Sequence, residues 1–167
     1  MSATPSPACR SSFAQLVATL DYPLYIVTTA VDGERSGCLI GFATQCSIHP
    51  PRFLACISKK NHTFGLVQQA GVVAVHVVDR DNKELAELFG GQTGDEVDKF
   101  SATGWHEVDG VPVLEDCARW FAGTVLERID LGDHMGLLPS PLDVDPSERE
   151  GQLTYQQARD MEPGHKP

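Results

Sequence analysis

The stretch SGCLIGFATQCSIHPPRFLACISKKNHT, residues 36–63, indicates both the fold and a binding site. Its first half is small and rich in hydroxyl groups, and Gly37 and Gly41 leave the backbone open to a flat ligand because glycine has no Cβ. The Pro-Pro pair that follows fixes an extended turn, and residues 52–57 predict a buried strand. The stretch therefore predicts two strands joined by a turn, with room for a ligand on the first.

The second predicted strand leads into a polar loop, SKKNHT at residues 58–63. This loop offers two ammonium groups, two hydroxyl groups, an amide and an imidazole immediately before a predicted helix. A phosphate dianion is bound by such groups at a helix N-terminus. A strand rich in Gly, Ser and Thr is by itself more typical of close packing, and a Lys-Lys pair of a solvated turn. Because the two features occur together, they indicate a mononucleotide site.

The composition is that of one acidic globular domain. The chain has 167 residues, 41% of them hydrophobic, with a formal net charge of −10 and a mean hydropathy of −0.17, which suits a single domain. A surface that binds nucleic acid needs clustered Lys and Arg side chains. The basic cluster near the candidate site is limited to Lys59 and Lys60. We therefore expect no nucleic-acid partner.

The cysteines and the first residues give expectations about metals, redox state and location. The five cysteines include no C-x-x-C pair and no Cys/His cluster at zinc-like spacing, so we expect no metal site. Their odd number fits reduced thiols. No apolar run approaches the ~20 residues that span a bilayer, and residues 1–10 lack the apolar segment of a signal peptide. We therefore expect a cytoplasmic protein that does not bind a membrane.

Local patterns predict many short strands and few helices. Residues 1–10 are expected to be a disordered lead, residues 11–155 the folded domain and residues 156–167 a polar tail. The predicted helices cover residues 13–20 after Ser12 as N-cap, residues 63–70 before Gly71 in the left-handed region, and residues 82–89 after Asp81. The predicted strands include residues 22–30, 52–57, 72–78, 120–129 and 152–155.

The connections between these elements favour a small antiparallel barrel over an α/β sheet. A hairpin turn is predicted at residues 31–35, and residues 142–150 are expected to be a loose loop. GGQTGDE at residues 90–96 matches neither a P-loop nor a Rossmann turn, so we expect a mobile loop there. His76, between two valines, is expected to be a buried residue of the barrel wall.

Short motifs along most of the chain match one known family in order and spacing. Beside residues 36–63, they are NKELAELFGG at 82–91, DKF at 98–100, GVPVL at 110–114, LGDH at 131–134 and QLTY at 152–155. Together they resemble the flavin reductase-like family of FMN-binding split β-barrels. The chain departs from the family pattern at Leu39, Gly41 and Phe42. Backbone groups are therefore expected to replace some side-chain bonds to the flavin ring.

The resemblance implies a fold, cofactors and an assembly. The fold is mainly β with short helices, a split antiparallel β-barrel. The cofactor is FMN or FAD, and the hydride donor is NADH or NADPH. The family also implies a homodimer with the flavin at or near the subunit interface.

Candidate site residues follow from the polar side chains and the resemblance. The phosphate candidates are Ser58, Lys59, Asn61, His62 and Thr63, with Lys60 as a second source of charge. The candidates for the flavin ring are Thr44, Gln45, Cys46 and Ser47. The catalytic candidate is His134, oriented by Asp133. Its imidazole could stack on the nicotinamide or flavin, hydrogen-bond the carboxamide, or only fasten the hairpin.

These assignments predict an NAD(P)H-dependent flavin reductase. Such an enzyme transfers hydride from the nicotinamide to FMN or FAD, and the reduced flavin goes to a partner monooxygenase or to another acceptor. Two alternatives stay open. One is an electron-transfer protein that retains FMN and has no nicotinamide site. The other is a non-enzymatic dimeric barrel that has lost flavin or binds another planar ligand such as haem.

Overall fold

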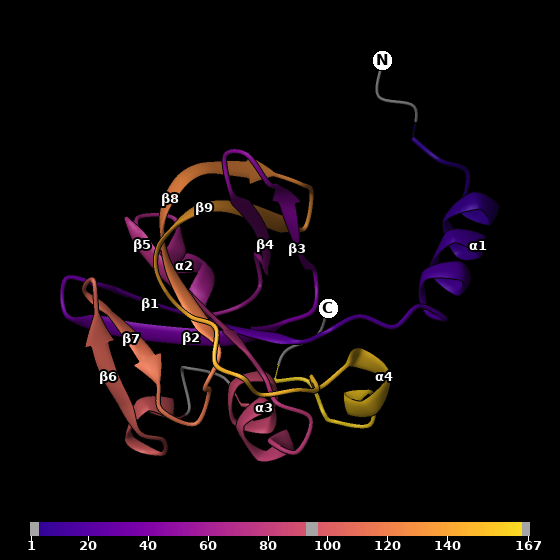
Figure 1. Ribbon diagram of the computed structural model, residues 1–167. Helices are drawn as coiled ribbons and strands as arrows, with labels where there is room; N and C mark the ends of the chain where they lie inside the picture. The colour runs from indigo at the N-terminus through magenta and orange to yellow at the C-terminus, as the bar shows by residue number, and fades with distance from the viewer. Residues whose placement is uncertain (1–3, 93–96, 165–167) are drawn as a thin grey trace.

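A seven-stranded antiparallel sheet, in the order β2-β1-β5-β8-β9-β4-β3, forms the body of the protein (Figure 1). The computed structural model describes residues 4–92 and 97–164. The strands of this sheet are β1 (Tyr25–Val31), β2 (Glu34–Ile40), β3 (Ala43–Ser47), β4 (Arg52–Ser58), β5 (Val72–Val77), β8 (Trp120–Asp130) and β9 (His134–Asp145). A separate hairpin consists of β6 (Trp105–Val108) and β7 (Val111–Leu114). The helices are α1 (Pro7–Val17), α2 (Thr63–Val67), α3 (Lys83–Gly90) and α4 (Tyr155–Ala158), with a 3-10 turn at Lys99–Ser101.

The sheet rolls into a split barrel because its two outer strands follow each other in the chain. β2 and β3 are joined by Gly41 and Phe42 alone, and the Phe42 carbonyl accepts a hydrogen bond from the Cys56 N–H at 2.9 Å. The hairpin between β1 and β2 turns at Asp32 and Gly33, both at positive φ, as a two-residue hairpin turn of this kind requires. The predicted barrel and hairpin are confirmed.

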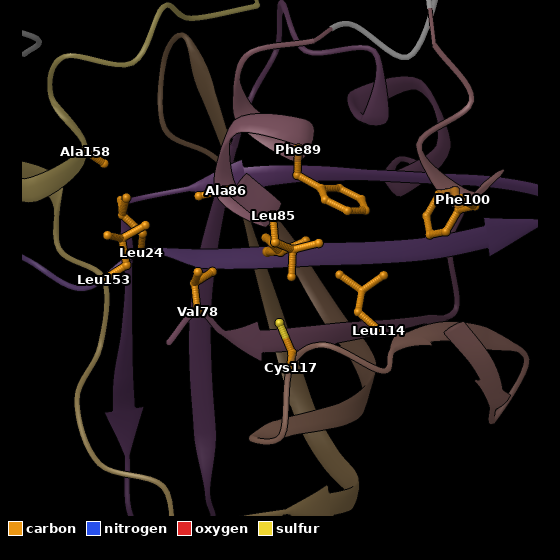
Figure 2. Close-up of a cluster of buried hydrophobic side chains, with 11 residues drawn as sticks. Leu24, Val78, Leu85, Ala86, Phe89, Phe100, Leu114, Cys117, Leu153 and Ala158 are labelled. Atoms are coloured by element: carbon orange, nitrogen blue, oxygen red, sulfur yellow. The ribbon is translucent and has the colours of Figure 1, made fainter. Parts of the chain in front are cut away.

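Two apolar clusters pack on the two faces of the sheet. Successive strand residues point to opposite faces, so Ile26 belongs to one cluster and Val27 to the other. The cluster around Val27 fills the barrel interior. The cluster around Ile26 packs α3 against the outer face (Figure 2), through residues that include Leu24, Val78, Leu85, Phe89, Leu114 and Leu153. This packing fixes β1 and β5, on which the barrel is built.

His76 on β5 is a neutral, buried imidazole. Its side chain is inaccessible, and the Leu114 N–H donates to Nε2 at 3.0 Å. Because Nε2 accepts, the ring proton is on Nδ1, which donates to the Ile26 carbonyl at 2.9 Å. Burial lowers the pKa of His76 to about 4. The expected role of His76 as a satisfied wall residue is confirmed.

The DKF segment forms a turn that ties β2 to α3. The Asp98 carboxylate accepts from the Phe100 N–H at 3.1 Å. The buried Lys99 ammonium donates to the carbonyls of Gly37 at 3.3 Å and Phe89 at 3.1 Å, and burial lowers the pKa of Lys99. The lysine therefore replaces water as the donor to two carbonyls that the fold removes from solvent.

The N-terminal helix begins earlier than predicted. The Ser6 hydroxyl caps it by accepting from the Cys9 N–H at 3.2 Å, and Pro7 occupies its first turn, where proline is favoured. The predicted start at residue 13 after Ser12 is therefore wrong, and part of the expected disordered lead is helical. Every residue of α1 is exposed, and Figure 1 shows the helix standing away from the barrel.

Three further boundaries differ from the prediction. α2 ends at Val67, because the following turn is tightened by a bond from the Gln69 N–H to the Leu66 carbonyl, and Gly71 does not adopt positive φ. α3 begins after Asn82 instead of after Asp81. The first long strand begins at residue 25 instead of residue 22. Of the predicted mobile loop, residues 93–96 lie outside the described part of the chain.

The C-terminal segment is more ordered than predicted. β9 continues to Asp145, opposite Trp120 of β8, so the loose loop expected from residue 142 begins later. The strand predicted at residues 152–155 is wrong: Thr154 forms an isolated bridge with Pro23, and α4 begins at Tyr155. The start of the expected polar tail is docked, because the Gln156 amide donates to the carbonyls of residues 18 and 20 at 3.2 and 2.9 Å. Tertiary contacts supply an order that the polar composition of this segment does not suggest.

Candidate functional site

A cavity of about 220 Å³ lies between β2, β4 and the start of β9. It brings together three of the predicted site residues, Ser58, Asn61 and His134, and it is also lined by Phe42 and Tyr22. Ser58 and His134 are direct partners in the pairing of β4 with β9. The polar loop and the tip of the β8–β9 hairpin therefore form one site, which we call the loop-end cavity.

The polar loop is anchored to the hairpin tip through Lys59. Its N–H donates to the Asp133 carbonyl at 2.9 Å, and its ammonium donates to Asp130 Oδ1 at 2.7 Å. The bond from Lys59, together with one from the Gly132 N–H, lowers the pKa of the Asp130 carboxyl. Lys59 is thus placed beside the loop-end cavity with an anionic partner of its own, so an incoming phosphate has to compete with that carboxylate.

His134 is oriented by its neighbour in the chain and by an aromatic ring. Its Nδ1 lies 2.7 Å from Asp133 Oδ1, a contact that lowers the pKa of the Asp133 carboxyl. The ring of Phe42 lies 5.1 Å from the imidazole, centroid to centroid, with a tilt of 49°. Because Asp133 engages Nδ1, Nε2 is the nitrogen available to meet a ligand.

The end of the polar loop is held by internal hydrogen bonds. Thr63 is 1% exposed, and its hydroxyl pairs with that of Ser36 at 2.8 Å. Its N–H donates to Asn61 Oδ1 at 3.0 Å. His62 Nε2 lies 4.0 Å from Glu34 Oε1. Thr63 therefore lies beneath the loop as packing, whereas Ser58 and Asn61 line the cavity.

The predicted ring residues lie on the edge strand β3, beyond the cavity. Thr44, Gln45 and Cys46 are exposed, and the Gln45 amide donates to the Ser47 carbonyl at 3.3 Å. Within the described residues, the cavity is lined by residues 38–42 of the same stretch instead of residues 44–47. The structure therefore brings residues 38–42 to the loop-end cavity, and the assignment of residues 44–47 to the flavin ring stays a prediction.

Sequence reasoning missed two aromatic residues of the cavity, Tyr22 and Tyr155. Their rings stack at 4.9 Å with an interplanar angle of 16°, and both line the cavity. The available signal was Gly41, because a Cβ there would lie 2.4 Å from Tyr22 Cε2. A glycine between apolar residues thus marked the close approach of an aromatic ring.

The cysteines that line the cavity are neutral thiols. Burial raises the pKa of Cys38 to about 11, and burial also raises the pKa of Cys56. A thiol that stays protonated is a poor nucleophile. In the described part of the chain the site is therefore suited to binding and positioning instead of cysteine-based covalent catalysis.

The profile of the flavin reductase like domain matches residues 17–163. The chain belongs to this family. It is 30% identical over 126 residues to the FMN reductase (NADH) RutF of Ancylobacter novellus, covering 75% of this chain and 69% of that protein. The family expected from the sequence motifs is confirmed.

Solved structures agree on the fold. The NADH:FAD oxidoreductase SgcE6 of Streptomyces globisporus superposes with a TM-score of 0.82 at 18% identity, covering 93% of this chain and 94% of its own. A nitrilotriacetate monooxygenase component B homolog from Mycobacterium thermoresistibile superposes with a TM-score of 0.74 at 22% identity, covering 84% and 78%. The predicted fold, mainly β with short helices, is confirmed.

The residues around the loop-end cavity fit part of a flavin mononucleotide. The wall made by Phe42 and Tyr22, whose rings lie 6.1 Å apart, suits a planar ring, and the hydroxyl of Ser58 and the amide of Asn61 suit a polar chain or a phosphate. The volume of about 220 Å³ is below the roughly 300–1,000 Å³ of ligand pockets in general. The lining of the loop-end cavity is therefore compatible with part of a flavin, and the cavity is too small to enclose a whole one.

Neither a metal site nor a membrane-spanning helix is found in the described parts of the chain. Across residues 4–92 and 97–164, no three His, Cys, Asp or Glu side chains are grouped so that they could hold a metal ion. The helices in these ranges are too short or too polar to cross a bilayer.

Proposed function

We propose that the protein is an NADH-dependent flavin reductase that acts on FMN or FAD. The observation that carries the proposal is the loop-end cavity, in which an aromatic wall, a polar loop and a carboxylate-bound histidine meet. The names of the relatives, an FMN reductase (NADH) and an NADH:FAD oxidoreductase, support the same activity and the same cofactors.

Each part of the site has a proposed role. Ser58, Lys59 and Asn61 bind the phosphate or the ribityl chain, and the ring lies against Phe42. His134 borders the nicotinamide side, where Asp133 holds its imidazole in one orientation. When bound, the flavin itself supplies the redox chemistry, so the chain has to bind, orient and exclude water, and no catalytic triad is needed.

The expected homodimer would complete this one-sided cavity. Large apolar side chains are exposed beside the hairpin tip at Leu126, Ile129 and Leu131. Such a group of exposed apolar residues is typical of a protein interface. We propose that a second copy covers this surface and closes the flavin site.

The reduced flavin needs an acceptor. The resemblance to a monooxygenase component B homolog supports a partner monooxygenase as that acceptor. The five free cysteines support a reducing compartment, and we propose the cytoplasm.

The test is a titration of the purified chain with FMN, FAD and riboflavin, followed by addition of NADH. We expect saturable quenching of flavin fluorescence with a dissociation constant in the micromolar range or below, about −8 kcal/mol or stronger, and loss of flavin absorbance with NADH. Tight binding of FMN that neither NADH nor NADPH reduces would instead identify an electron carrier. Binding of no flavin at all would leave the non-enzymatic barrel.

A further inference from the structure

A second cavity, of about 440 Å³, opens at the other end of the barrel. β4 runs from Arg52 at this cavity to Ser58 at the loop-end cavity, and β9 runs from His134 at the loop-end cavity to Asp145 at this one. The two cavities are therefore separated by the length of these strands. We call the second one the mouth and define it by Tyr25, Arg52, Phe53, Arg119, Trp120 and Phe121.

The floor of the mouth consists of aromatic rings. Tyr25 and Phe53 meet edge to face, with centroids 5.5 Å apart and an interplanar angle of 76°. Phe53 and Phe121 meet in the same way at 5.3 Å and 68°. All three rings are half-buried and pack on the interior cluster of the barrel. The floor therefore offers ring edges and faces to a planar apolar group.

Arg119 supplies a buried donor beside this floor. One of its terminal nitrogens, Nη2, donates to Asp79 Oδ1 at 2.7 Å and also to the Gly151 carbonyl. Its Nε is buried, and no acceptor for it exists among the described residues. A buried donor without an acceptor costs roughly 1–3 kcal/mol. Arg119 also lines the mouth, so its guanidinium supplies positive charge there.

Arg52 supplies a second cation on the rim. Its Nη1 donates to the Pro51 carbonyl at 2.7 Å and to the Ser140 hydroxyl at 3.1 Å. Both of these acceptors are neutral, so the charge of Arg52 is not balanced by them.

The charges around the mouth leave it positive. Asp79 is shared by Arg119 and Arg149, whose Nη1 lies 3.2 Å from Asp79 Oδ2. Asp145 also lines the mouth. Among the residues that line the mouth, two guanidinium groups, those of Arg52 and Arg119, are thus set against one carboxylate, that of Asp145, in a chain whose net charge is −10. Arginine is well suited to bind a carboxylate, because its planar donors match the two oxygens.

We propose that the mouth is a second ligand site that binds a small aromatic carboxylate. The ring rests on Tyr25, Phe53 and Phe121, and the carboxylate is bound by Arg119 and Arg52. A volume of about 440 Å³ lies within the roughly 300–1,000 Å³ of ligand pockets and admits one or two fused rings. The two cavities share no lining residue. Gln45, one of the residues predicted to contact the flavin ring, lines the mouth, and competition with FMN tests the independence of the two sites.

The test uses naphthoate as the probe and its neutral amide, naphthamide, as the matched ligand. The full chain, isotope-labelled, is titrated while backbone amide signals are followed. We expect saturable shifts for residues of the mouth, with those of residues 58–63 unmoved, and an affinity for naphthamide about tenfold lower, which corresponds to about 1.4 kcal/mol. Equal binding of both ligands, or shifts centred on residues 58–63, would overturn the proposal.

Substitutions of single arginines test whether Arg52 and Arg119 bind the carboxylate of naphthoate. Arg52→Gln is expected to lower naphthoate affinity about tenfold and to leave naphthamide binding unchanged. The matched control is Arg35→Gln, which removes the same charge from an exposed position on β2 and should leave both affinities unchanged. Arg119→Gln should also weaken naphthoate, and a melting curve separates this effect from a loss of folding. Equal affinities of wild type, Arg52→Gln and Arg35→Gln would overturn the proposal.

Two further measurements separate this proposal from others. Saturating FMN should leave naphthoate affinity unchanged, whereas displacement by FMN would make the mouth part of the flavin site and overturn the proposal. Naphthoate affinity should also be independent of protein concentration. Binding that emerges only on dilution would mean that a second copy covers the mouth. A chain that binds naphthoate but no flavin would contradict the proposed function alone.

Discussion

The loop end of the barrel and the mouth differ in where their residues come from in the chain. At the loop end, two short segments, residues 58–63 and 130–134, supply most of the polar groups, and backbone hydrogen bonds join them. At the mouth, short groups of residues come from three distant places in the chain, Tyr25, Arg52–Phe53 and Arg119–Phe121, and ring contacts and guanidinium groups form the site. The comparison teaches that a site made of contiguous segments can be found in the sequence, whereas a site made by barrel closure requires the fold.

The largest expected effect is a loss of folding stability in acid, caused by the buried His76 in the barrel wall behind the mouth. His76 pairs in register with Trp120 of the mouth, and its folded-state pKa is about 4 against a usual 6.5. The folded state disfavours protonation of this ring. The stability contributed by the neutral imidazole is therefore fully present above pH 6.5 and is lost as the pH falls toward 4. The loss is at most about 3 kcal/mol. Chemical unfolding at several pH values measures it.

A variant isolates the histidine from the other groups that titrate in this range. His76→Gln keeps a donor and an acceptor, so it should fold with lower stability at neutral pH and show a shallower loss between pH 6.5 and 4. An unchanged slope in this variant would assign the acid sensitivity to other groups. The carboxylates of Asp130 and Asp133 have lowered pKa values, so their contribution is lost mainly at still lower pH.

The second prediction tests whether the loop end positions the reacting groups. His134→Ala should slow single-turnover reduction of a saturated flavin by NADH about 100-fold, since a small displacement of reacting groups costs a factor of this size. Flavin affinity should change little. The control is His106→Ala, which removes an exposed imidazole from β6. A parallel fall in melting temperature and flavin affinity, with reduction unchanged, would mean that His134 only fastens the hairpin.

The third prediction separates phosphate binding from ring binding at the loop end. Combined Lys59→Ala and Lys60→Ala should weaken FMN by roughly 1.5–3 kcal/mol, the size of a charge-assisted contact, and spare riboflavin. Asp130→Asn should act in the opposite direction, because it releases the Lys59 ammonium from its 2.7 Å partner. If the lysine variant loses FMN and riboflavin equally, the two lysines support the fold and not the phosphate.

The smallest expected effect concerns the aromatic wall. Phe42→Leu removes the ring that lies 5.1 Å from His134, and an aromatic pair contributes about 0.5–1.5 kcal/mol. FMN and riboflavin should therefore be weakened alike, by less than the lysine variant weakens FMN. Fluorescence titration with both flavins measures this. A gain in affinity would indicate that Phe42 competes with the flavin ring for its place against His134.

Much of the fold could be predicted from local chemistry. The turn at Asp32 and Gly33, the strand before the polar loop and the family motifs all describe contiguous residues whose conformation is set by their neighbours. The contact of Asp133 with His134 was predicted for the same reason, since the two residues are adjacent.

The remaining features depend on contacts between distant segments. The burial of Thr63 follows from its bond to Ser36, 27 positions earlier, and the docking of Gln156 follows from its bonds to residues 18 and 20. Residues 38–42 line the loop-end cavity whereas residues 44–47 lie on the edge strand β3, a division that their shared small-residue pattern does not reveal. The mouth gave no local signal, because its aromatic rings are far apart in the sequence.

The central claim is that this chain binds a flavin at the loop end and positions it for reduction by NADH. Anaerobic stopped-flow mixing of the FMN-saturated protein with NADH tests it most directly. The account predicts loss of flavin absorbance in a single turnover at a rate that saturates with NADH concentration and falls in His134→Ala. A protein that binds FMN and shows no loss of absorbance with NADH, or shows the same rate as free FMN, would contradict it.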